Sequence, residues 1–579
     1  MRVGKIVSED VHLRAPKAHV RCRHAVASAA RFGALGSVFC LVSLLQCALP
    51  ALASVPASSA VGAGAPASGA PRNHAVSASQ TLTINEYTVE GNHLLSEEEI
   101  DNAVYPYLGP GQTTHSVDQA RAALQKIYAD KGYQTVEVLI PPQHVHDGIV
   151  VLKVVEGKIG RLTVKGSRYF SLNEIKSEAP SLKPGTVPNF KKVTQDIVAL
   201  NSWPDRQVTP VLKAGTTPGT VDVDLNVKDQ LPLHASIGLD NRYSANTKPL
   251  RLDTSLSYDN LWQRGDSLSF SFEVAPQYSP DAEVFSGSYL ARIPGVDWAS
   301  ILLYGLVSNS NVSTVGSVNV VGKGHVIGTR GIFTLPGGSG FFDTLSAGID
   351  YKDFDQNVML GGETLPTPVT YFPITATYSA TWQGGDGSTT QLDIGPTFGI
   401  RGLGSDTTEF DNRRYDAQGD FFYVKGDLSR LQPLPAGFQI YGKTQAQIAN
   451  EPLLNSEQFS GGGQDTVRGY LESEVLGDDA ILGSLELRTP SLTELMGRKL
   501  AAQVEDWRIF TWVEGGQLNT LDPLPEQQSM FNLASVGIGT RIKLFDHLNG
   551  MVDLALPVLS SVTTKAGNPR IEFHVWVEY

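Results

Sequence analysis

The spacing of apolar residues along the chain changes once, near residue 230. Before this point, apolar residues recur at helical spacing in several segments, one of which contains Val117, Ala120, Leu124 and Ile127. After it, polar and apolar residues alternate, most strictly from Ser267 to Val274. Helical spacing indicates amphipathic helices, and alternation indicates strands with one apolar and one polar face. The sequence therefore predicts an α+β region followed by an all-β region.

The α+β region contains one pattern twice, with a spacing of 75 positions. In each copy, a strand that ends in a glycine turn is followed by a serine and, three residues later, a glutamate, which together indicate a helix capping box. The shared positions are Thr88/Thr163, Val89/Val164, Gly91/Gly166, Ser96/Ser171, Glu99/Glu174 and Ile100/Ile175. We predict two copies of one module, at residues 81–156 and 157–229, with the order strand, helix, helix, strand, strand. This order resembles that of the periplasmic POTRA domain.

The later elements of each module can also be placed from the pattern. The first module is predicted to have a helix ending near Gly132 and strands at 135–140 and 149–155, and the second a helix at 190–200 and strands at 208–212 and 220–227.

Residues 230–579 predict a transmembrane β-barrel. Tight turns rich in Gly, Pro and Asp join the alternating segments, and between them come longer polar loops at 309–325, 352–370 and 402–415. Short turns that alternate with long loops are typical of outer-membrane barrels, which have an even number of strands. The pattern contains about 16 segments, so we predict a 16-stranded antiparallel barrel without helices. The alternative is a soluble β-sandwich, which would need another reason for so long a run of strands.

The end of the chain supports the barrel. Alternate residues place one apolar face on the last predicted strand, and the final residue is aromatic; the face consists of Ile571, Phe573, Val575, Val577 and Tyr579. This pattern resembles the terminal-strand signal that outer-membrane barrels present to their assembly machinery. We therefore expect that machinery and outer-membrane lipid as partners of the chain.

The beginning of the chain is typical of a secretory signal peptide at residues 1–53. Seven basic residues accompany an apolar run from Phe32 to Leu52, and Ala51-Leu52-Ala53 forms an A-x-A cleavage site. A membrane anchor is the alternative, because the run is near the length that spans a bilayer. Residues 54–80 contain mostly Ala, Ser, Gly and Pro, which predicts a flexible linker.

Cysteine content and charge exclude several classes of function. All three cysteines (Cys22, Cys40 and Cys47) precede the predicted cleavage site, so the mature chain would have neither disulfides nor thiolate chemistry. Removing residues 1–53 takes away seven basic and two acidic residues and leaves 39 basic against 57 acidic, a net charge of −18. Such an acidic chain is not expected to bind nucleic acid.

One long polar loop, residues 450–478, stands out among the predicted connections. It contains Gly461-Gly462-Gly463 and then Val467-Arg468-Gly469-Tyr470. Irregular loops of this length are uncommon in compact domains unless they have a function. Counting strands, this loop joins the eleventh to the twelfth.

Two POTRA-like modules, a 16-stranded barrel and a sixth long loop with Val467, Arg468, Gly469 and Tyr470 together resemble one family. It is the outer-membrane component of two-partner (type V) secretion, the haemolysin and filamentous-haemagglutinin transporter family. The resemblance covers nearly all of residues 81–579. The segments Gly477-Asp478-Asp479 and Leu485–Pro490 continue the family's usual pattern.

The family has a second motif on strand 13, which Trp512, Glu514 and Gly516 occupy here. The family usually has Phe and Asp where this chain has Trp512 and Glu514. The resemblance implies that the loop folds into the barrel lumen and that Arg468 meets this acid. A guanidinium in the lumen needs a fixed carboxylate, preferably a bidentate one. Because we expect the lumen to be wet, the pair would contribute only about 1 kcal/mol.

The resemblance implies a transporter that recognises a large partner exoprotein through its POTRA modules and exports it through the barrel. An adhesin, a haemolysin or a growth-inhibition toxin is the expected kind of partner. A barrel-assembly factor or insertase of the same superfamily is the first alternative, and a passive porin is the second. Motifs for serine, zinc or nucleotide chemistry are absent from the sequence, so we expect neither enzymatic activity nor a cofactor. His144 and His146 lack a third ligand, so we predict no metal site.

Overall fold

The computed structural model describes residues 81–579 except 202, 204, 316–317, 356, 361–362 and 498–502. The predicted signal peptide and linker lie outside these residues. Two compact units make up the described chain: the modules, up to Pro232 together with Asp259–Gly265, and the remaining residues, which form the barrel. Among the described residues, no helix is long and apolar enough to cross a membrane.

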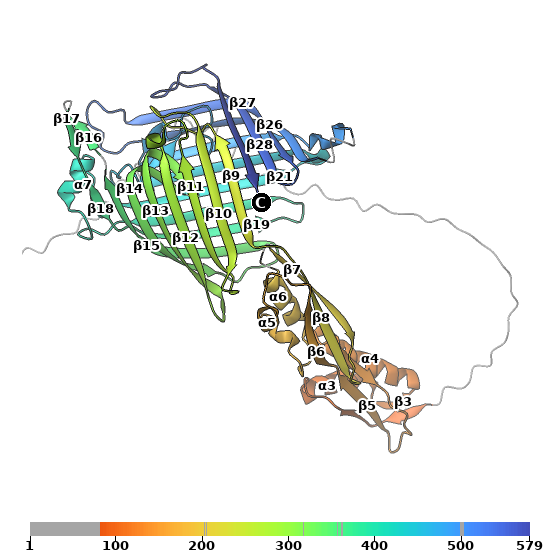
Figure 1. Ribbon diagram of the computed structural model, residues 1–579. Helices are drawn as coiled ribbons and strands as arrows, with labels where there is room; N and C mark the ends of the chain where they lie inside the picture. The colour runs from red at the N-terminus through yellow and green to blue at the C-terminus, as the bar shows by residue number, and fades with distance from the viewer. Residues whose placement is uncertain are drawn as a thin grey trace, which may run out of the picture. The chain divides into compact units, whose positions relative to one another are not determined.

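The two modules share one topology, as the repeat predicts (Figure 1). The first contains β2 (Glu86–Glu90), α3 (Glu97–Val104), α4 (Thr114–Asp130), β4 (Val136–Leu139) and β5 (Ile149–Glu156). The second contains β6 (Lys158–Lys165), α5 (Leu172–Ser177), α6 (Phe190–Leu200), β7 (Arg206–Ala214) and β8 (Thr220–Asp229). The sheet orders are β2-β5-β4 and β6-β8-β7, so the last strand of each module is central and pairs in parallel with β2 or β6 at one edge.

The first module has one addition that the pattern does not predict. The short strands β1 (Leu82–Ile84) and β3 (Gly109–Gln112) pair with each other outside the main sheet. The predicted helix stripe packs inward, because Val117, Ala120 and Leu124 are buried against the sheet. Burial of this stripe is the main source of stability in a domain of this size.

The capping-box prediction is confirmed in the first module and wrong in the second. The Ser96 hydroxyl accepts from the Glu99 backbone N–H, and the Glu99 carboxylate accepts from the Ser96 N–H. At the equivalent α5, Ser171 makes no side-chain cap. Its backbone N–H donates instead to the side-chain oxygen of Gln263, at 2.8 Å, so Glu174 has no donor to accept from at this position.

The second unit is a closed antiparallel barrel (Figure 1). Its strands are β9 (Leu233–Asp240), β10 (Arg251–Leu261), β11 (Asp266–Val274), β12 (Glu283–Ile293), β13 (Val296–Val315), β14 (Val318–Thr334), β15 (Phe341–Asp355), β18 (Val369–Tyr371), β19 (Ile374–Gln383), β20 (Thr389–Phe398), β21 (Phe422–Pro433), β22 (Gln439–Ala449), β25 (Asp479–Arg488), β26 (Val504–Asn519), β27 (Met530–Leu544), β28 (Leu548–Pro557) and β29 (Arg570–Glu578). Both β18 and β19 pair with β15, so they are two parts of one wall strand. The described ring therefore has 16 wall strands, as the sequence predicts.

Successive residues of each wall strand point alternately to the lipid and to the lumen. Large apolar residues such as Phe270, Ile301, Leu303 and Val307 are exposed on the outer face. Polar residues between them point inward, where Arg330 pairs with Asp350. A wall with one apolar and one polar face satisfies its backbone through interstrand bonds and can stand in a bilayer.

The long loops differ from the prediction at three places. Strands β13 and β14 continue through most of 309–325, which contains five valines among its polar residues, and β-branched residues favour strands. Residues 352–370 contain a hairpin of β16 (Asn357–Leu360) and β17 (Glu363–Pro366). Residues 402–415 contain a helix, α7 (Thr407–Arg413), where none was expected.

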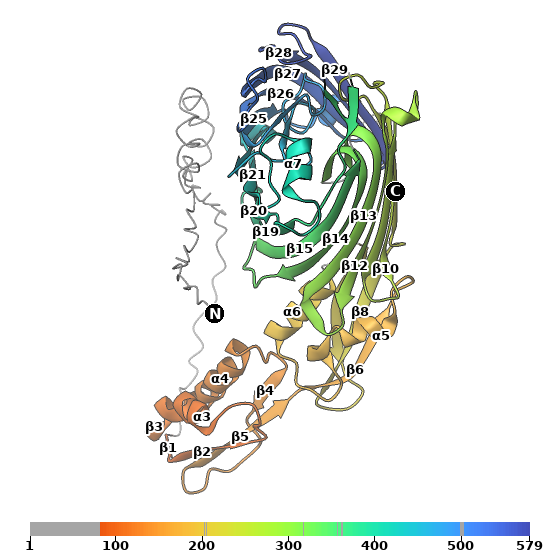
Figure 2. The ribbon, with the colours of Figure 1, turned by 90° about the vertical axis from the view of Figure 1, so that its left-hand side faces the viewer.

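Helix α7 begins at a capping box formed by Asp406 and Glu409. Figure 1 places it at one end of the barrel strands, and Figure 2 shows it within the outline of the ring. Its Phe410 is buried in an apolar cluster with residues from several wall strands and loops, including Tyr371, Phe421 and Leu453. The helix therefore covers the mouth of the barrel at the end where the long loops lie.

Candidate functional site

Loop 450–478 leaves the wall between β22 and β25 and folds into the lumen. Two short strands, β23 (Phe459–Gly461) and β24 (Val475–Gly477), pair to form its stalk. Gly462 and Gly463 follow the stalk with φ near +100°, a conformation that favours glycine. The chain then turns through Val467-Arg468-Gly469-Tyr470 against the inner wall.

Arg468 is held mainly by Glu514 of β26. Glu514 Oε1 accepts from Arg468 Nη2 at 2.5 Å and from Nε at 2.9 Å, and Oε2 accepts from the Arg468 backbone N–H at 2.8 Å. The guanidinium carbon also lies 3.8 Å from the ring centroid of Trp512, a cation–π contact. The structure thus brings together Arg468, Glu514 and Trp512, which the two motifs singled out.

Three further carboxylates surround the tip of the loop, two of them at Arg468 and one at Gly469. Glu486 Oε2 on β25 lies 3.2 Å from Arg468 Nη2, and Asp553 Oδ2 on β28 lies 3.5 Å from Nη1. Glu572 Oε1 on β29 accepts from the Gly469 backbone N–H at 3.0 Å. The loop tip therefore meets acids from four wall strands.

The sequence reasoning did not identify these three acids as part of the site. Each lies at an inward position of an alternating strand, so the pattern does show that it points into the lumen. The pattern does not give the strand register, which places the acids of β25, β28 and β29 at the same height along the barrel wall. Glu486 lies opposite Trp512 in the β25–β26 register, which is the link that could have identified it.

The expectation that the pair is exposed to water is wrong. Arg468 is 4% exposed and Glu514 is 5% exposed, with the rings of Trp512 and Phe510 against the guanidinium, although both charged residues border a cavity in the lumen. Removing one partner from a buried pair costs about 3–5 kcal/mol, because the other charge stays buried without compensation. The contact is therefore a strong constraint on the loop position.

Two other residues of the loop motif also hold the loop against the barrel wall. Val467 and Tyr470 are fully buried in an apolar cluster with Leu482, Leu518 and Leu533 of the wall. The Tyr470 hydroxyl lies 2.9 Å from Ala534 O and 2.7 Å from Leu559 O. An aromatic body in an apolar pocket with its hydroxyl satisfied is the usual state of a buried tyrosine.

Both motif glycines stand where a side chain would be strained. Gly469 has φ +91° and packs against Ala555 and Pro557. A Cβ on Gly516 would lie 2.4 Å from the carbonyl oxygen of Ile481 on the neighbouring strand. The turn at the tip and the close strand approach behind it both require glycine.

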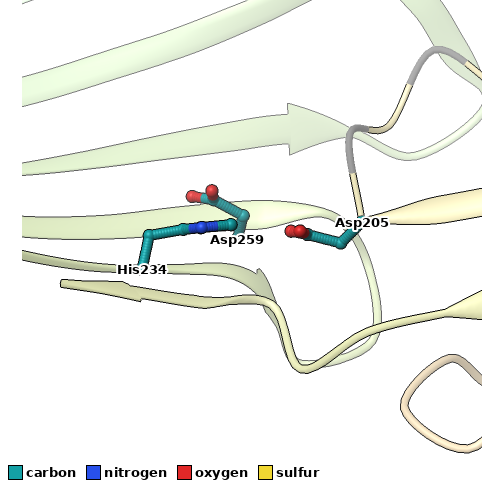
Figure 3. Close-up of side chains that lie close together, drawn as sticks. All are labelled: Asp205, His234 and Asp259. Atoms are coloured by element: carbon teal, nitrogen blue, oxygen red, sulfur yellow. The ribbon is translucent and has the colours of Figure 1, made fainter. Parts of the chain in front are cut away.

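Two groups of acidic and histidine side chains in the described residues bring their ligand atoms close together. Figure 3 shows Asp205, His234 and Asp259; the two aspartates belong to the unit of the modules and His234 to the barrel, so we assign no site to them. In the lumen, His574 Nε2 lies 3.6 Å from Asp253 Oδ1, close to Asp240. This spacing is that of a histidine–carboxylate pair, and we assign no metal to it.

Comparisons with known proteins agree with the fold and the loop. Residues 82–157 match the family model "POTRA domain, ShlB-type". Residues 371–542, which contain the loop and the wall motif, match the model "Haemolysin secretion/activation protein ShlB/FhaC/HecB".

Individual relatives have low sequence identity to this chain, but their alignments with it cover most of its length. The chain is 23% identical over 409 residues to the outer membrane transporter CdiB of Dickeya dadantii, covering 69% of this chain and 70% of that protein. It is 20% identical over 408 residues to the heme/hemopexin transporter protein HuxB of Haemophilus influenzae, with coverage of 69% and 70%. The solved structure of CdiB from Escherichia coli superposes with a TM-score of 0.60 at 19% identity, covering 96% of this chain and 98% of that one.

The modules, the 16-stranded barrel and the lumenal loop define an outer-membrane transporter of the POTRA-barrel class. Within this class, the chain is a two-partner secretion transporter, and its segment 371–542 matches the model of the haemolysin secretion/activation proteins ShlB/FhaC/HecB.

Proposed function

We propose that this transporter exports one large partner protein, which its two modules recognise before export and which passes through the barrel when loop 450–478 moves. The observation that carries the proposal is the placement of the loop tip inside the lumen, with Arg468 buried among three wall carboxylates and the Gly469 N–H bound by a fourth. An arginine in a solvated loop would need none of these partners. The loop therefore occupies the path that an exported chain would take.

The modules offer strand edges to an extended client. Strands β2 and β4 border the first sheet, and β6 and β7 border the second. An exposed edge can accept another strand through main-chain hydrogen bonds, which suits an unfolded client because few particular side chains are needed. A large β-helical adhesin, haemolysin or growth-inhibition toxin fits this mode of recognition.

The test uses co-expression with a candidate partner exoprotein, sought among the genes adjacent to this one, followed by assay of the medium. Arg468→Ala and Arg468→Lys should leave a heat-modifiable barrel in the outer membrane and reduce export at least tenfold. Lysine keeps the charge but cannot repeat the contacts of Nε and Nη2. Arg401→Ala is the matched control, because Arg401 also belongs to a long loop but makes an exposed pair with Asp420. Wild-type export by both Arg468 variants would refute the role of the loop.

Deletion of residues 81–228 separates this function from the alternatives. A transporter should lose export of its client, whereas a passive porin should keep conducting and lose no client. A barrel-assembly factor should instead show lower levels of other outer-membrane barrels after the deletion. Export that persists without the modules would contradict recognition by them.

A further inference from the structure

Loop 450–478 carries a second buried charge, the carboxylate of Glu457. The Glu457 side chain is 1% exposed. Its Oε1 accepts from Lys352 Nζ at 2.5 Å and from the Tyr371 hydroxyl at 2.6 Å, and its Oε2 accepts from the Tyr423 hydroxyl at 2.9 Å. Both oxygens are satisfied by wall residues, so the charge has a built site of its own.

This site lies on a different part of the wall from the site of Arg468. Lys352 is on β15, Tyr371 on β18 and Tyr423 on β21, which stand on one side of β22 in the ring. The acids around the loop tip are on β25, β26, β28 and β29, which stand on the other side. The loop leaves the wall between these two arcs and is fixed to both.

The position of Glu457 within the loop determines what its carboxylate can control. Glu457 lies two residues before the stalk strand β23, and its backbone carbonyl accepts from Gln447 Nε2 at 3.1 Å. A shift of Glu457 would therefore shift the stalk. Arg468, at the far end of the loop, fixes the tip but not the direction from which the stalk enters.

Stability alone is a poor reason for a charge at this position. Burying a carboxylate has a large desolvation cost, and replacing a buried ion pair by apolar residues of the same volume is often neutral or stabilising. A carboxylate that meets one ammonium and two hydroxyls from three wall strands is, however, held at one place on the wall. The contact constrains where the loop lies.

We propose that Glu457 is a second positioning residue for export: together with Arg468 it holds loop 450–478 across the lumen, and release of both contacts accompanies passage of the client. The proposal rests on the proposed function, because it assumes that the loop moves during export.

The first test compares Glu457→Gln with Glu451→Gln. The two glutamates belong to the same loop, but Glu451 Oε1 has no hydrogen-bond partner among the described residues. Glu457→Gln keeps the side-chain volume and removes the charge that pairs with Lys352. We expect at least a tenfold loss of export with a heat-modifiable barrel still present, and a several-fold rise in single-channel conductance in planar bilayers. Glu451→Gln should leave both within twofold of wild type.

A charge exchange keeps the proposal testable if a single variant does not fold. Glu457→Lys and Lys352→Glu each place like charges together, and the double variant restores an opposite pair. The hydroxyls of Tyr371 and Tyr423 can rotate to accept as well as donate, so the exchanged pair remains satisfied. Export and conductance should recover in the double variant to within threefold of wild type. A double variant no better than either single one would overturn the proposal.

A cross-link reports the loop position directly. Gln464 Nε2 lies 3.4 Å from Met551 Sδ of β28, and cysteines occur only at positions 22, 40 and 47, so Gln464→Cys with Met551→Cys gives a clean pair. Glu457→Gln should slow cross-linking by a short bismaleimide at least fivefold. An unchanged rate together with wild-type export would refute a positioning role for Glu457. The Arg468 variants test the proposed function separately: if they abolish export while Glu457→Gln does not, only this inference fails.

Discussion

Glu514 is one methylene longer than the aspartate that the family usually has, and its contacts show what the extra length allows. One carboxylate oxygen meets the guanidinium of Arg468, and the other meets the Arg468 backbone N–H. A shorter side chain at the same wall position could not span both groups without movement of the loop. The glutamate therefore fixes the main chain of the loop as well as the arginine.

This geometry predicts a graded series at residue 514. Glu514→Asp should keep the guanidinium contact, lose the one to the backbone and lower export several-fold. Glu514→Ala should abolish export and cost about 3–5 kcal/mol, because Arg468 stays buried without its main partner. Export assays and denaturant unfolding in detergent measure the two effects. Equal export by the aspartate and alanine variants would show that the backbone contact, not the guanidinium contact, is the essential one.

The sequence was sufficient to predict that Arg468 and Glu514 belong together, but only through the resemblance to a family. Spacing along one chain gives the inward face of a strand and not its register against strands that are distant in sequence. For this reason Asp553 and Glu572, which come from β28 and β29, could not be placed beside the loop. The sequence also could not show that these two acids are buried, because the loop that covers them has no regular pattern of polar and apolar residues.

A second group of charged residues makes the stability of the modules depend on pH. Asp224 on β8 accepts from Lys165 Nζ at 2.7 Å and from Lys213 Nζ at 2.6 Å. The hydrogen bonds from these two lysines lower the pKa of Asp224 from 3.8 to about 2. Because the folded pKa is lower than the unfolded one, the stabilisation is complete above about pH 4 and is lost as the pH falls through about 2.

We expect Asp224→Asn to lower the urea midpoint of the modules at pH 5–7 and to match wild type near pH 2. Urea unfolding followed at pH 7, 4 and 2 measures the difference. Asp222→Asn is the matched control, because Asp222 lies on the same strand but contacts one exposed cation, Arg161. A difference that persisted unchanged to pH 2 would contradict the assignment.

Among the elements, Asp478 joins three long loops at the mouth of the barrel. It is fully buried at the root of loop 450–478 and pairs with Arg414 of the loop that contains α7. Its oxygens also accept from the backbone N–H groups of Leu453, at 2.9 Å, and Leu521, at 2.7 Å. Loops 399–421, 450–478 and 520–529 therefore depend on one carboxylate.

Asp478→Asn should release α7 from the mouth. The amide has no charge for Arg414, so we expect a loss of about 3 kcal/mol, as for other buried pairs that lose one partner. Limited proteolysis of intact cells should cut within 399–421 faster than in wild type. Asp420→Asn, which breaks the exposed pair with Arg401, should change stability by about 0–1 kcal/mol and leave the cleavage rate unaltered. Equal cleavage of both variants would show that Asp478 does not hold this loop.

At the scale of secondary-structure elements, the sequence predicted the strands better than the loops. Alternation marks a wall strand because each residue faces either lipid or lumen, and the same rule gave 16 strands. The loops follow no such rule. The capping box of α7, at Asp406 and Glu409, is visible in the sequence, but the helix that follows it is too short for its pattern to be distinguished from a polar turn. Strands β13 and β14 extend into the predicted loop, where several valines, which favour strands, stand among the polar residues.

The whole barrel is closed by its last strand, which pairs with its first. The β29–β9 register runs from His574 opposite Asp240 to Glu578 opposite Ser236. Tyr579 extends this closure through its backbone, since its N–H donates to Ala235 O at 2.9 Å and its carbonyl accepts from Ala235 N–H at 3.1 Å. The Tyr579 side chain points outward and is 67% exposed.

The exposed ring of Tyr579 allows assembly to be separated from stability. A side chain that contacts little protein contributes little to the folded barrel, whereas a terminal aromatic face is what assembly machinery would recognise, together with Phe573, Val575 and Val577. We therefore expect Tyr579→Ala to lower the amount of heat-modifiable barrel in the outer membrane several-fold, while the barrel that does assemble keeps its wild-type unfolding midpoint and its export per molecule. Leu495→Ala is the control, because Leu495 is 83% exposed in a connection and not on the terminal strand. A lowered unfolding midpoint in Tyr579→Ala would instead assign the residue to barrel closure.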